Sequence, residues 1–296
     1  MNSVETVSAV SRAVPRREAG ILGRWARAGV LALAGTGVVG SGVYTGVNQY
    51  QQSQQVKELA GRLNFLNKEF NTRITLDQVM DVVKNITPST VRVEGSQGLG
   101  SGVIIVTPQG NRYILTNGHV TQDNEFKKNE MGDSTYHIKL YNGTDYSSSV
   151  EFDAAPVILG NGQRAFSSPE EHDLALLQIP PNVKIPDGAG VVLRDLEADP
   201  VRVGEPVIVV GNPFGERDSV TFGIISHTDR QAVGLNKNHH FQTDAPINPG
   251  NSGGGLFDMH GRLIGINTWG YRGGDGVGGS IRVDEIIKML KGWGTY

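Results

Sequence analysis

From Thr90 onward the chain consists of short apolar runs that alternate with Gly, Pro, Asn and Asp. Runs of this length are typical of strands joined by tight turns, and a regular series of them is typical of β-barrels or β-sandwiches. The sequence therefore predicts an all-β region of about twelve strands, enough for two six-stranded units that divide near 187–200. The predicted strands are 90–94, 101–106, 112–117, 137–141, 155–159, 174–179, 191–194, 206–210, 219–226, 240–243, 262–268 and 279–283.

Helical patterns flank the strands. Thr75 is followed three residues later by Gln78, a capping box that predicts the start of a helix, and Pro88 predicts its end. Near the carboxyl terminus, apolar residues at spacings of three and four predict a second helix over 284–292, with Asp284 as its cap.

Residues 51–72 carry a further stripe of apolar positions at spacings of three and four, which predicts a helical stalk. The stripe fits the seam of a short coiled coil over about two and a half heptads. It fits equally an amphipathic helix packed on its own domain, and so few heptads do not separate the two. The stripe consists of Val56, Leu59, Leu63, Leu66 and Phe70.

Residues 28–47 form a stretch of twenty without a charged side chain, which is the length that a helix needs to cross a bilayer. Residues 1–27 before it hold five arginines against two glutamates. This asymmetry predicts a basic cytoplasmic tail, a single transmembrane anchor and a chain that lies outside the cytoplasm from about residue 50. The alternative is a cleaved signal peptide, followed by secretion.

Composition narrows the function classes. The 296 residues include 40 glycines and no cysteine, and the formal net charge is −3. Without cysteine there is no disulfide, thiolate nucleophile or cysteine-based metal site. No basic block of the kind that contacts phosphates occurs, so a nucleic-acid partner is not expected.

Three segments each set one catalytic residue type between strand and turn residues. A serine hydroxyl is a weak nucleophile, and it needs an imidazole to take its proton and a buried carboxylate to hold the second ring nitrogen. The segments supply one of each, in the order His119 within 114–120, Asp173 within 171–177 and Ser252 within 248–254.

Glycines flank the serine at Gly250 and Gly253. They allow a tight turn in which the amides of Gly250 and Ser252 point at one developing oxyanion, so Gly250, Asn251 and Ser252 are the predicted oxyanion hole. The histidines at 227, 239 and 240 have no acidic or histidine partner at ligand spacing, so neither a metal nor a cofactor is predicted.

In these segments the chain resembles trypsin-like serine peptidases of the HtrA (Deg) type, over about residues 75–296. The resemblance implies two perpendicular six-stranded β-barrels of the chymotrypsin type, at about 89–190 and 200–283, with His119 and Asp173 on the first and Ser252 on the second. Relatives of this type usually carry PDZ domains, and the sequence implies a protein without one. The other matching segments, all in family order, are Gly98-Leu-Gly-Ser-Gly102-Val, Gly211-Asn-Pro-Phe-Gly215, Val220-Thr-Phe-Gly-Ile-Ile-Ser226 and Leu263-Ile-Gly-Ile-Asn-Thr268.

The resemblance also implies where substrate binds. Trypsin has an acid six residues before the nucleophile, and Pro246 stands there in this chain, with Ile247 next. An apolar pocket of modest size is therefore expected, which favours small or medium aliphatic residues before the cut, although Asp244 is close enough in sequence to reach it. The expected substrate-binding residues are Pro246, Ile247, Asn267, Thr268, Trp269 and Gly270, the last three as a strand that pairs with the substrate backbone.

Activation by cleavage is not expected. In digestive relatives a new amino terminus pairs with an aspartate directly before the serine, and this chain has the uncharged Asn251 there. The predicted function is a membrane-anchored serine endopeptidase that acts on polypeptides in the periplasm or at the cell surface. The alternative is a non-enzymatic peptide holder or chaperone with a latent triad. A homotrimer is expected from the resemblance alone.

Overall fold

A computed structural model describes residues 74–95, 98–122, 135–141, 149–212, 219–231, 237–271 and 276–296, together with Lys57. The predicted basic tail (1–27) and membrane span (28–47) lie outside the described residues, and so does the predicted stalk (51–72) except for Lys57. Within the ranges that the structure describes, no helix has both the length and the apolar character needed to cross a membrane.

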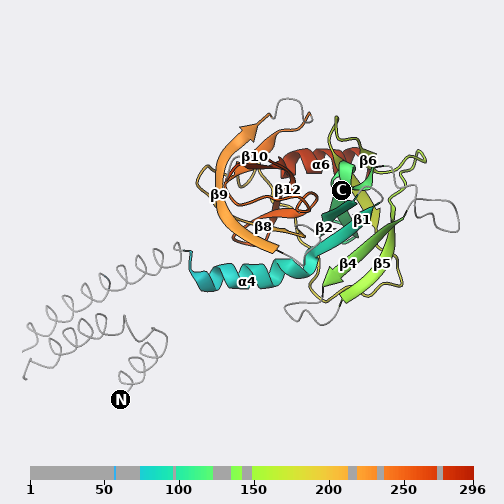
Figure 1. The fold of residues 1–296 in the computed structure, drawn as a ribbon, viewed down its shortest axis with the longest axis horizontal. Coiled ribbons are helices and arrows are strands. Elements are labelled where there is room, and N and C mark those ends of the chain that lie inside the picture. The colour runs from blue at the N-terminus through green and yellow to red at the C-terminus, as the bar shows by residue number, and fades with distance from the viewer. Residues whose placement is uncertain are drawn as a thin grey trace, which may run out of the picture. The chain divides into compact units, whose positions relative to one another are not determined.

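The amino-terminal half of the strand region closes into a barrel of six antiparallel strands (Figure 1). The order is β3-β2-β1-β4-β5-β7, and pairing of β7 with β3 closes the ring, while the two-residue β6 extends it beside β7. The strands are β1 (Thr90–Gly95), β2 (Gly98–Val106), β3 (Arg112–Thr116), β4 (Tyr136–Tyr141), β5 (Ser149–Pro156), β6 (Phe166–Ser167) and β7 (Leu174–Gln178).

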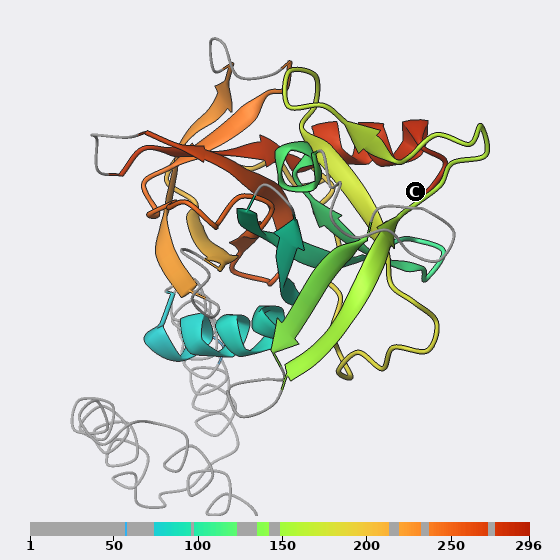
Figure 2. The same ribbon diagram turned by 45° about the vertical axis from the view of Figure 1, so that its right-hand side comes forward.

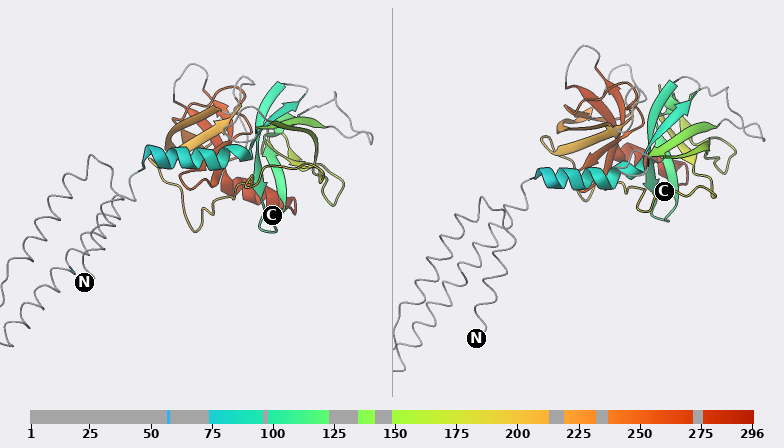
Figure 3. Two further views of the ribbon diagram at one scale, coloured as in Figure 1. Left: turned by 90° about the horizontal axis from the view of Figure 1, so that it is seen from below. Right: turned by 60° about the horizontal axis from the view of Figure 1, so that its bottom comes forward.

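The carboxyl-terminal half forms a second closed barrel, in the order β10-β13-β12-β11-β8-β9. Figure 3 shows the two barrels side by side, the first in blue-green to green and the second in orange to red. The prediction of an all-β fold with two six-stranded units is confirmed. The strands are β8 (Pro206–Gly211), β9 (Ser219–Arg230), β10 (His240–Thr243), β11 (Gly255–Asp258), β12 (Leu263–Gly270) and β13 (Gly278–Arg282).

Each barrel has its own apolar interior, and a third cluster joins them. Val91, Ile138 and Leu177 belong to the interior of the first barrel, and Val209 and Phe241 to that of the second. The joining cluster combines strands of both barrels with the carboxyl-terminal helix, through Val103, Ile105, Leu115, Leu174, Leu176, Ile208, Val210, Phe257, Leu263, Ile286 and Leu290. Burial of this shared cluster holds the barrels together.

The helices follow the sequence signals. Helix α4 (Leu76–Ile86) starts at the Thr75 capping box, in which both reciprocal hydrogen bonds form, and a short 3₁₀ turn, η1 (Thr87–Ser89), follows it. Helix α6 (Val283–Gly292) runs from the second barrel toward the first (Figure 2). Asp284 lies in its first turn and is not its cap, because Arg282 holds the cap position without a side-chain hydrogen bond. The sequence did not predict α5 (Gly118–Thr121).

Two strand predictions are wrong. The apolar run 191–194 forms no strand and makes only single-residue bridges, from Val191 to Ile105 and from Leu193 to Leu263. It is the connection between the barrels, and its Val191 and Leu193 side chains enter the shared cluster, which explains why these two positions are apolar. In its place the second barrel uses β11 (Gly255–Asp258), which directly follows the glycine-rich segment. The fifth strand spans 149–156 instead of the predicted 155–159.

Arg194 fixes this connection. Its guanidinium is almost fully buried and is bonded to Glu205, Asp199 and Asp258. Burial alone would lower the pKa of Arg194, but the hydrogen bond and charge of Glu205, with the charges of Asp199 and Asp258, raise it above its usual value. A paired buried cation of this kind leaves the connection little freedom, because loss of one partner would leave an uncompensated charge.

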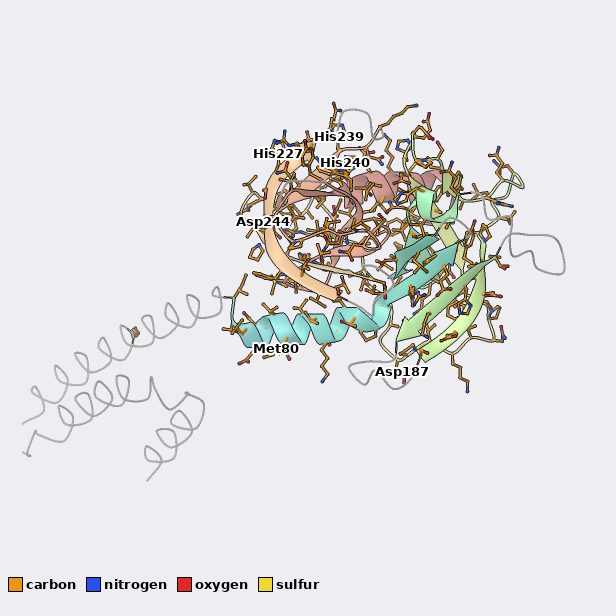
Figure 4. The ribbon with its side chains drawn as sticks, viewed as in Figure 1. Met80, Asp187, His227, His239, His240 and Asp244 are labelled. Atoms are coloured by element: carbon orange, nitrogen blue, oxygen red, sulfur yellow. The ribbon has the colours of Figure 1, made fainter. Side chains whose placement is uncertain are left out.

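His240 is fully buried in the second barrel, on β10 (Figure 4). Its ring meets Trp269 edge to face, its Nδ1 lies 3.3 Å from the Arg230 carbonyl oxygen, and its Nε2 has no hydrogen-bond partner within the ranges that the structure describes. Burial lowers the pKa of His240, and the Arg230 carbonyl and the negative charge of Asp173 only partly oppose this. The folded chain therefore holds a neutral histidine at pH values where the unfolded chain would bind a proton.

We predict that His240→Phe makes the free energy of unfolding fall less steeply as the pH is lowered. Because the unfolded chain binds a proton below about pH 6.5 and folded His240 does not, the wild type loses stability as the pH falls from there toward the lower folded pKa. One histidine contributes at most about 1.4 kcal/mol per pH unit to this slope. Denaturant unfolding at pH 5 to 8 measures it. His260→Phe, at an exposed position, should keep the wild-type slope, and an unchanged slope in His240→Phe would contradict the prediction.

Candidate active site

Ser252 lies in the second of two consecutive tight turns, 248–251 and 251–254, that follow β10. The Asn251 N–H donates to the Asn248 carbonyl oxygen at 2.9 Å, and the Gly254 N–H donates to the Asn251 carbonyl oxygen at 2.9 Å. In the first turn, Asn248-Pro-Gly-Asn251, Gly250 has a φ of 99°. Proline at the second position and glycine with positive φ at the third are the requirements of a type II turn, so this sequence selects the turn that precedes the serine.

Gly253 is required by close packing between the barrels. Its φ is 84°, and a Cβ atom there would lie 2.1 Å from the Ser101 carbonyl oxygen and 2.3 Å from the Thr116 hydroxyl. Both of these residues belong to the first barrel. The serine turn of the second barrel is therefore pressed directly against strands β2 and β3 of the first.

His119 lies on the short helix α5, directly after β3. Its Nδ1 is 2.9 Å from Oδ2 and 3.1 Å from Oδ1 of Asp173, and its backbone N–H donates to Oδ1 at 2.8 Å. The Asp173 side chain is 3% exposed and that of His119 is 37% exposed. Since an ionised carboxylate only accepts hydrogen bonds, this contact favours the tautomer with the proton on Nδ1 and leaves Nε2 as an acceptor.

Asp173 is the one residue other than glycine with a positive φ, 49°, in the part of the chain that the structure describes. Such a backbone costs about 1–3 kcal/mol and persists only where its surroundings enforce it. Here the Asp173 N–H donates to the Ser168 carbonyl oxygen at 2.9 Å, and the His172 N–H donates to the Ser167 hydroxyl at 3.0 Å.

The second barrel also clamps the residues just before Asp173. The Lys237 N–H donates to the Glu171 carbonyl oxygen at 2.8 Å, and the Asn238 side-chain amide donates to the His172 carbonyl oxygen at 2.7 Å. The Asn238 Oδ1 lies 2.7 Å from His172 Nδ1. The strained carboxylate position is thus held from both barrels.

Asn117 links the histidine segment to β12. Its Nδ2 donates to the Asp173 carbonyl oxygen at 2.9 Å and to the Thr268 hydroxyl at 3.0 Å. No pattern in the sequence marked Asn117 as part of the site, although it stands two residues before His119. Thr268 thus supports the Asp173 backbone through Asn117, while its own hydroxyl donates to the Ile266 carbonyl oxygen.

The structure brings the serine and histidine segments together at Gly100. A Cβ atom at Gly100 would lie 2.6 Å from the side chain of Val120, the neighbour of His119, and 3.2 Å from the Ser252 carbonyl oxygen. Among the described residues, the Ser252 hydroxyl has one hydrogen bond, a long one of 3.5 Å to the Thr268 carbonyl oxygen, and none to His119. Catalytic hydrogen bonds are often long or absent without substrate and tighten when it binds.

The backbone N–H groups of the expected oxyanion residues differ in whether they are already hydrogen-bonded. The Asn251 N–H is used inside the type II turn. Among the described residues, the N–H groups of Gly250 and Ser252 have no acceptor. The turn therefore leaves these two amides, and not that of Asn251, available to a ligand.

The expected substrate residues surround the same turn. The Ile247 side chain would lie 2.8 Å from a Cβ atom at Gly278, and its carbonyl oxygen 2.5 Å from one at Gly270. The Pro246 carbonyl oxygen accepts a hydrogen bond from Thr221 at 3.0 Å. Asp244, on the β9 side of this region (Figure 4), uses Oδ1 to accept the Ile224 N–H at 2.7 Å.

Asn267 and Trp269 on β12 face inward. Asn267 Nδ2 donates to the Gly255 carbonyl oxygen at 3.0 Å, and its Oδ1 accepts the Ser280 hydroxyl at 2.8 Å. The Trp269 ring fills the space above Gly279, where a Cβ atom would lie 2.1 Å from it. The side chain of Asn267 therefore supports β12 from inside the barrel.

Asp229 on β9 contacts two of the three histidines at 227, 239 and 240. His239 Nδ1 contacts Asp229, whose backbone N–H donates to His227 Nδ1 at 3.0 Å, and both histidines lie at the upper end of these strands in Figure 4. No group of three or more histidine and acidic side chains within the described ranges has the arrangement to hold a metal ion.

Comparisons with curated proteins agree with this geometry. The chain is 40% identical over 173 residues to the periplasmic pH-dependent serine endoprotease DegQ of Escherichia coli (strain K12), which covers 58% of this chain and 31% of DegQ. It is 30% identical over 239 residues to the serine protease Do-like HtrA of Bacillus subtilis (strain 168), which covers 71% of this chain and 47% of that protein. The chain thus spans between about a third and a half of the length of these relatives.

Solved structures show the same likeness. The serine endoprotease from Yersinia pestis matches with a TM-score of 0.54 and 29% identity, over 75% of this chain and 67% of that chain. The HtrA-type protease AlgW, solved with a tripeptide, matches with a TM-score of 0.53 and 34% identity, over 71% and 62%. The model of the trypsin-like peptidase domain matches residues 100–266, more than half of the sequence. With its two closed barrels and its HtrA-type relatives, this chain belongs to the trypsin-like peptidase family.

Proposed function

We propose that the chain is a serine endopeptidase that hydrolyses peptide bonds through an acyl-enzyme on Ser252. The observation that carries the proposal is the His119–Asp173 pair, in which a buried carboxylate holds Nδ1 of a partly exposed imidazole at 2.9 Å. The serine turn packs against the same barrel wall, beside Val120. A base oriented in this way is what a weak hydroxyl nucleophile requires.

In the proposed mechanism, His119 Nε2 takes the Ser252 hydroxyl proton while Oγ forms a bond to the substrate carbonyl carbon. The imidazolium then gives this proton to the leaving amine as the C–N bond breaks. Water repeats the sequence, and the carboxylic acid product leaves. Asp173 stays ionised throughout and stabilises the imidazolium.

The amides of Gly250 and Ser252 are the proposed oxyanion donors, because the Asn251 N–H is already bonded to Asn248. The direction of the Gly250 N–H depends on the type II turn, since a type I turn would rotate the Pro249–Gly250 peptide to face the other way. The positive φ of Gly250 thus serves the donor geometry directly.

Gly250→Ala is expected to lower kcat by about 10²-fold, because alanine disfavours the positive φ and so the donor orientation of the turn. Hydrolysis of a peptide substrate under saturating conditions measures the effect. Gly204→Ala is the matched control, since Gly204 has a φ of 85° in a turn with open space around it. Equal activity of the two variants would count against the oxyanion assignment.

The substrate is proposed to pair with Thr268, Trp269 and Gly270 as an added strand, with its side chain before the cut in an apolar pocket beside Ile247. The contacts of Ile247 with Gly270 and Gly278 support this, because they place Ile247 against the paired ends of β12 and β13, next to the strand proposed to hold the substrate. A pocket without a counter-charge and of small width favours small or medium aliphatic side chains. Pro246 and Asn267 support its walls.

Ile247→Ala should widen the pocket and shift its preference toward larger residues. We expect the ratio of kcat/KM for phenylalanine over valine at the position before the cut to rise by about tenfold. Discrimination of this size is typical when a hydrophobic pocket gains or loses the volume of a methylene group. Peptide substrates that differ only at this position measure it. Ile224→Ala, on the outer face of β9, should leave the ratio unchanged. The same ratio in both variants would contradict the assignment of Ile247 to the pocket.

The location is proposed to be extracytoplasmic, with residues 28–47 as a single membrane anchor or as a signal peptide that is removed. The uncharged span behind a basic segment supports this, and the relatives DegQ and DegP of E. coli are named periplasmic. Assembly as a homotrimer belongs to the same proposal. Polypeptides are the proposed substrates.

A second function is a peptide holder whose triad rests inactive. The bond of the Ser252 hydroxyl to the Thr268 carbonyl oxygen, in place of one to His119, is the observation that favours it. Such a protein would keep unfolded substrates from aggregating without cutting them.

Ser252→Ala is expected to lower the rate of casein hydrolysis by about 10⁴–10⁶-fold, because it removes the nucleophile and leaves only binding and oxyanion stabilisation. A fluorophosphonate probe should label the wild type in the membrane fraction and should not label the variant. Wild-type protein that protects casein from aggregation, with neither cleavage nor labelling, would establish the holder instead. Equal labelling of wild type and variant would exclude Ser252 as nucleophile.

A further inference from the structure

Ser101, on β2 of the first barrel, is fully buried and is bonded to the serine turn of the second barrel. We propose that Ser101 is a positioning residue, which sets the turn carrying Ser252 against the barrel that carries His119. The proposal rests on the proposed peptidase function. It also gives a role to the segment 98–102, which the triad chemistry leaves without one.

Ser101 bonds the nucleophile turn at two points. Its hydroxyl donates to the Gly250 carbonyl oxygen at 2.7 Å, and its backbone N–H donates to the Ser252 carbonyl oxygen at 2.8 Å. The hydroxyl oxygen also accepts the Asn212 N–H at 2.8 Å, from the end of β8 in the second barrel. Ser101 therefore holds both neighbours of Asn251: Gly250 through its hydroxyl and Ser252 through its backbone N–H.

The same residue is tied to the histidine. The Ser101 carbonyl oxygen accepts a hydrogen bond from the Thr116 hydroxyl at 2.6 Å, and Thr116 ends β3 three residues before His119. Ser101 thus links the segment of the general base with the segment of the nucleophile. Because the Ser252 hydroxyl has no hydrogen bond to His119 among the described residues, the relative placement of these two groups rests on such indirect links.

A hydroxyl is the group that fits this position. It must donate to Gly250 and accept from Asn212 at once, which serine does with one atom. A Cβ atom at Gly253 would lie 2.1 Å from the Ser101 carbonyl oxygen, so the turn packs closely against this part of β2. Removal of the hydroxyl leaves the buried Asn212 N–H without an acceptor and the Gly250 carbonyl oxygen without a donor, and the turn is then expected to move so that this carbonyl finds another donor.

This movement should affect the transition state more than substrate binding. Gly250 supplies a proposed oxyanion donor, and Ser252 supplies the nucleophile, so both act during bond formation. The proposed substrate strand, 268–270, is also anchored outside the turn, through the Asn267 side chain, which bonds Gly255 and Ser280. The expected signature is therefore a change in kcat with little change in KM.

The test compares Ser101→Ala with Ser89→Ala in the full chain. Ser89 is an equally buried serine whose hydroxyl accepts a backbone N–H, that of Gly190 at 2.8 Å, away from the triad. We expect Ser101→Ala to lower kcat by about 10- to 100-fold with KM within about threefold, and to weaken binding of a peptidyl boronate by a similar factor. Ser89→Ala should keep the wild-type kcat, and Ser101→Thr, which restores the hydroxyl, should recover most of it.

Hydrogen exchange gives a readout that does not need activity. The hydrogen-bonded amides of the turn, those of Asn251, Gly253 and Gly254, should exchange faster in Ser101→Ala and at the wild-type rate in Ser89→Ala. If Ser101→Ala does not fold, Ser101→Cys is measured in the same way, because a thiol has similar size but bonds more weakly. Wild-type kcat, an equal kcat loss in the Ser89 variant, or unchanged exchange of the Asn251, Gly253 and Gly254 amides would each overturn the proposal. A wild type that fluorophosphonate does not label would overturn the proposed function instead, while the exchange comparison still decides whether Ser101 holds the turn.

Discussion

The geometry of the site depends on hydrogen bonds that cross between two closed barrels. In a closed barrel each strand is paired on both sides, so no free edge remains through which one barrel could extend the sheet of the other. Apolar contact holds the barrels together but is non-directional and sets no hydrogen-bond geometry. The placement of Ser252 against the His119–Asp173 pair therefore falls to a few polar contacts. Ser101 supports the serine turn, Asn117 ties Asp173 to β12, and Asn238 clamps the residue before Asp173.

These contacts also explain how strained backbone is tolerated at the site. Asp173 has a positive φ, and the residues on either side of Ser252, Gly250 and Gly253, are glycines with positive φ as well. Glycine adopts this conformation without steric cost, whereas an aspartate does so only under constraint. The constraint on Asp173 comes from the Ser168 carbonyl oxygen within its own barrel and from Asn238 in the other. The strained Asp173 backbone thus requires both barrels to be folded and docked.

The sequence predicted the parts of this fold that depend on neighbours in the chain. The capping box at Thr75 predicted α4, because both partners lie within one helical turn. The glycines around Ser252 predicted its turn for the same reason. The roles of Ser101 and Asn238 could not be predicted, since their partners lie 149 and 66 residues away. The run at 191–194 was assigned to a strand because the connection between the barrels is as buried and apolar as a strand.

Asn251 shows how the turn that carries Ser252 is built without an ion pair. Its side chain is fully buried, and neither of its polar atoms has a hydrogen-bond partner among the described residues. A carboxylate in this place would need a buried cation, because an isolated charge is far more costly to bury than a neutral amide. With asparagine, no charge has to be neutralised before the turn can order. Ordering then depends on neutral hydrogen bonds to the turn backbone, from Ser101 and within the Asn248–Asn251 turn, which need no newly formed amino terminus.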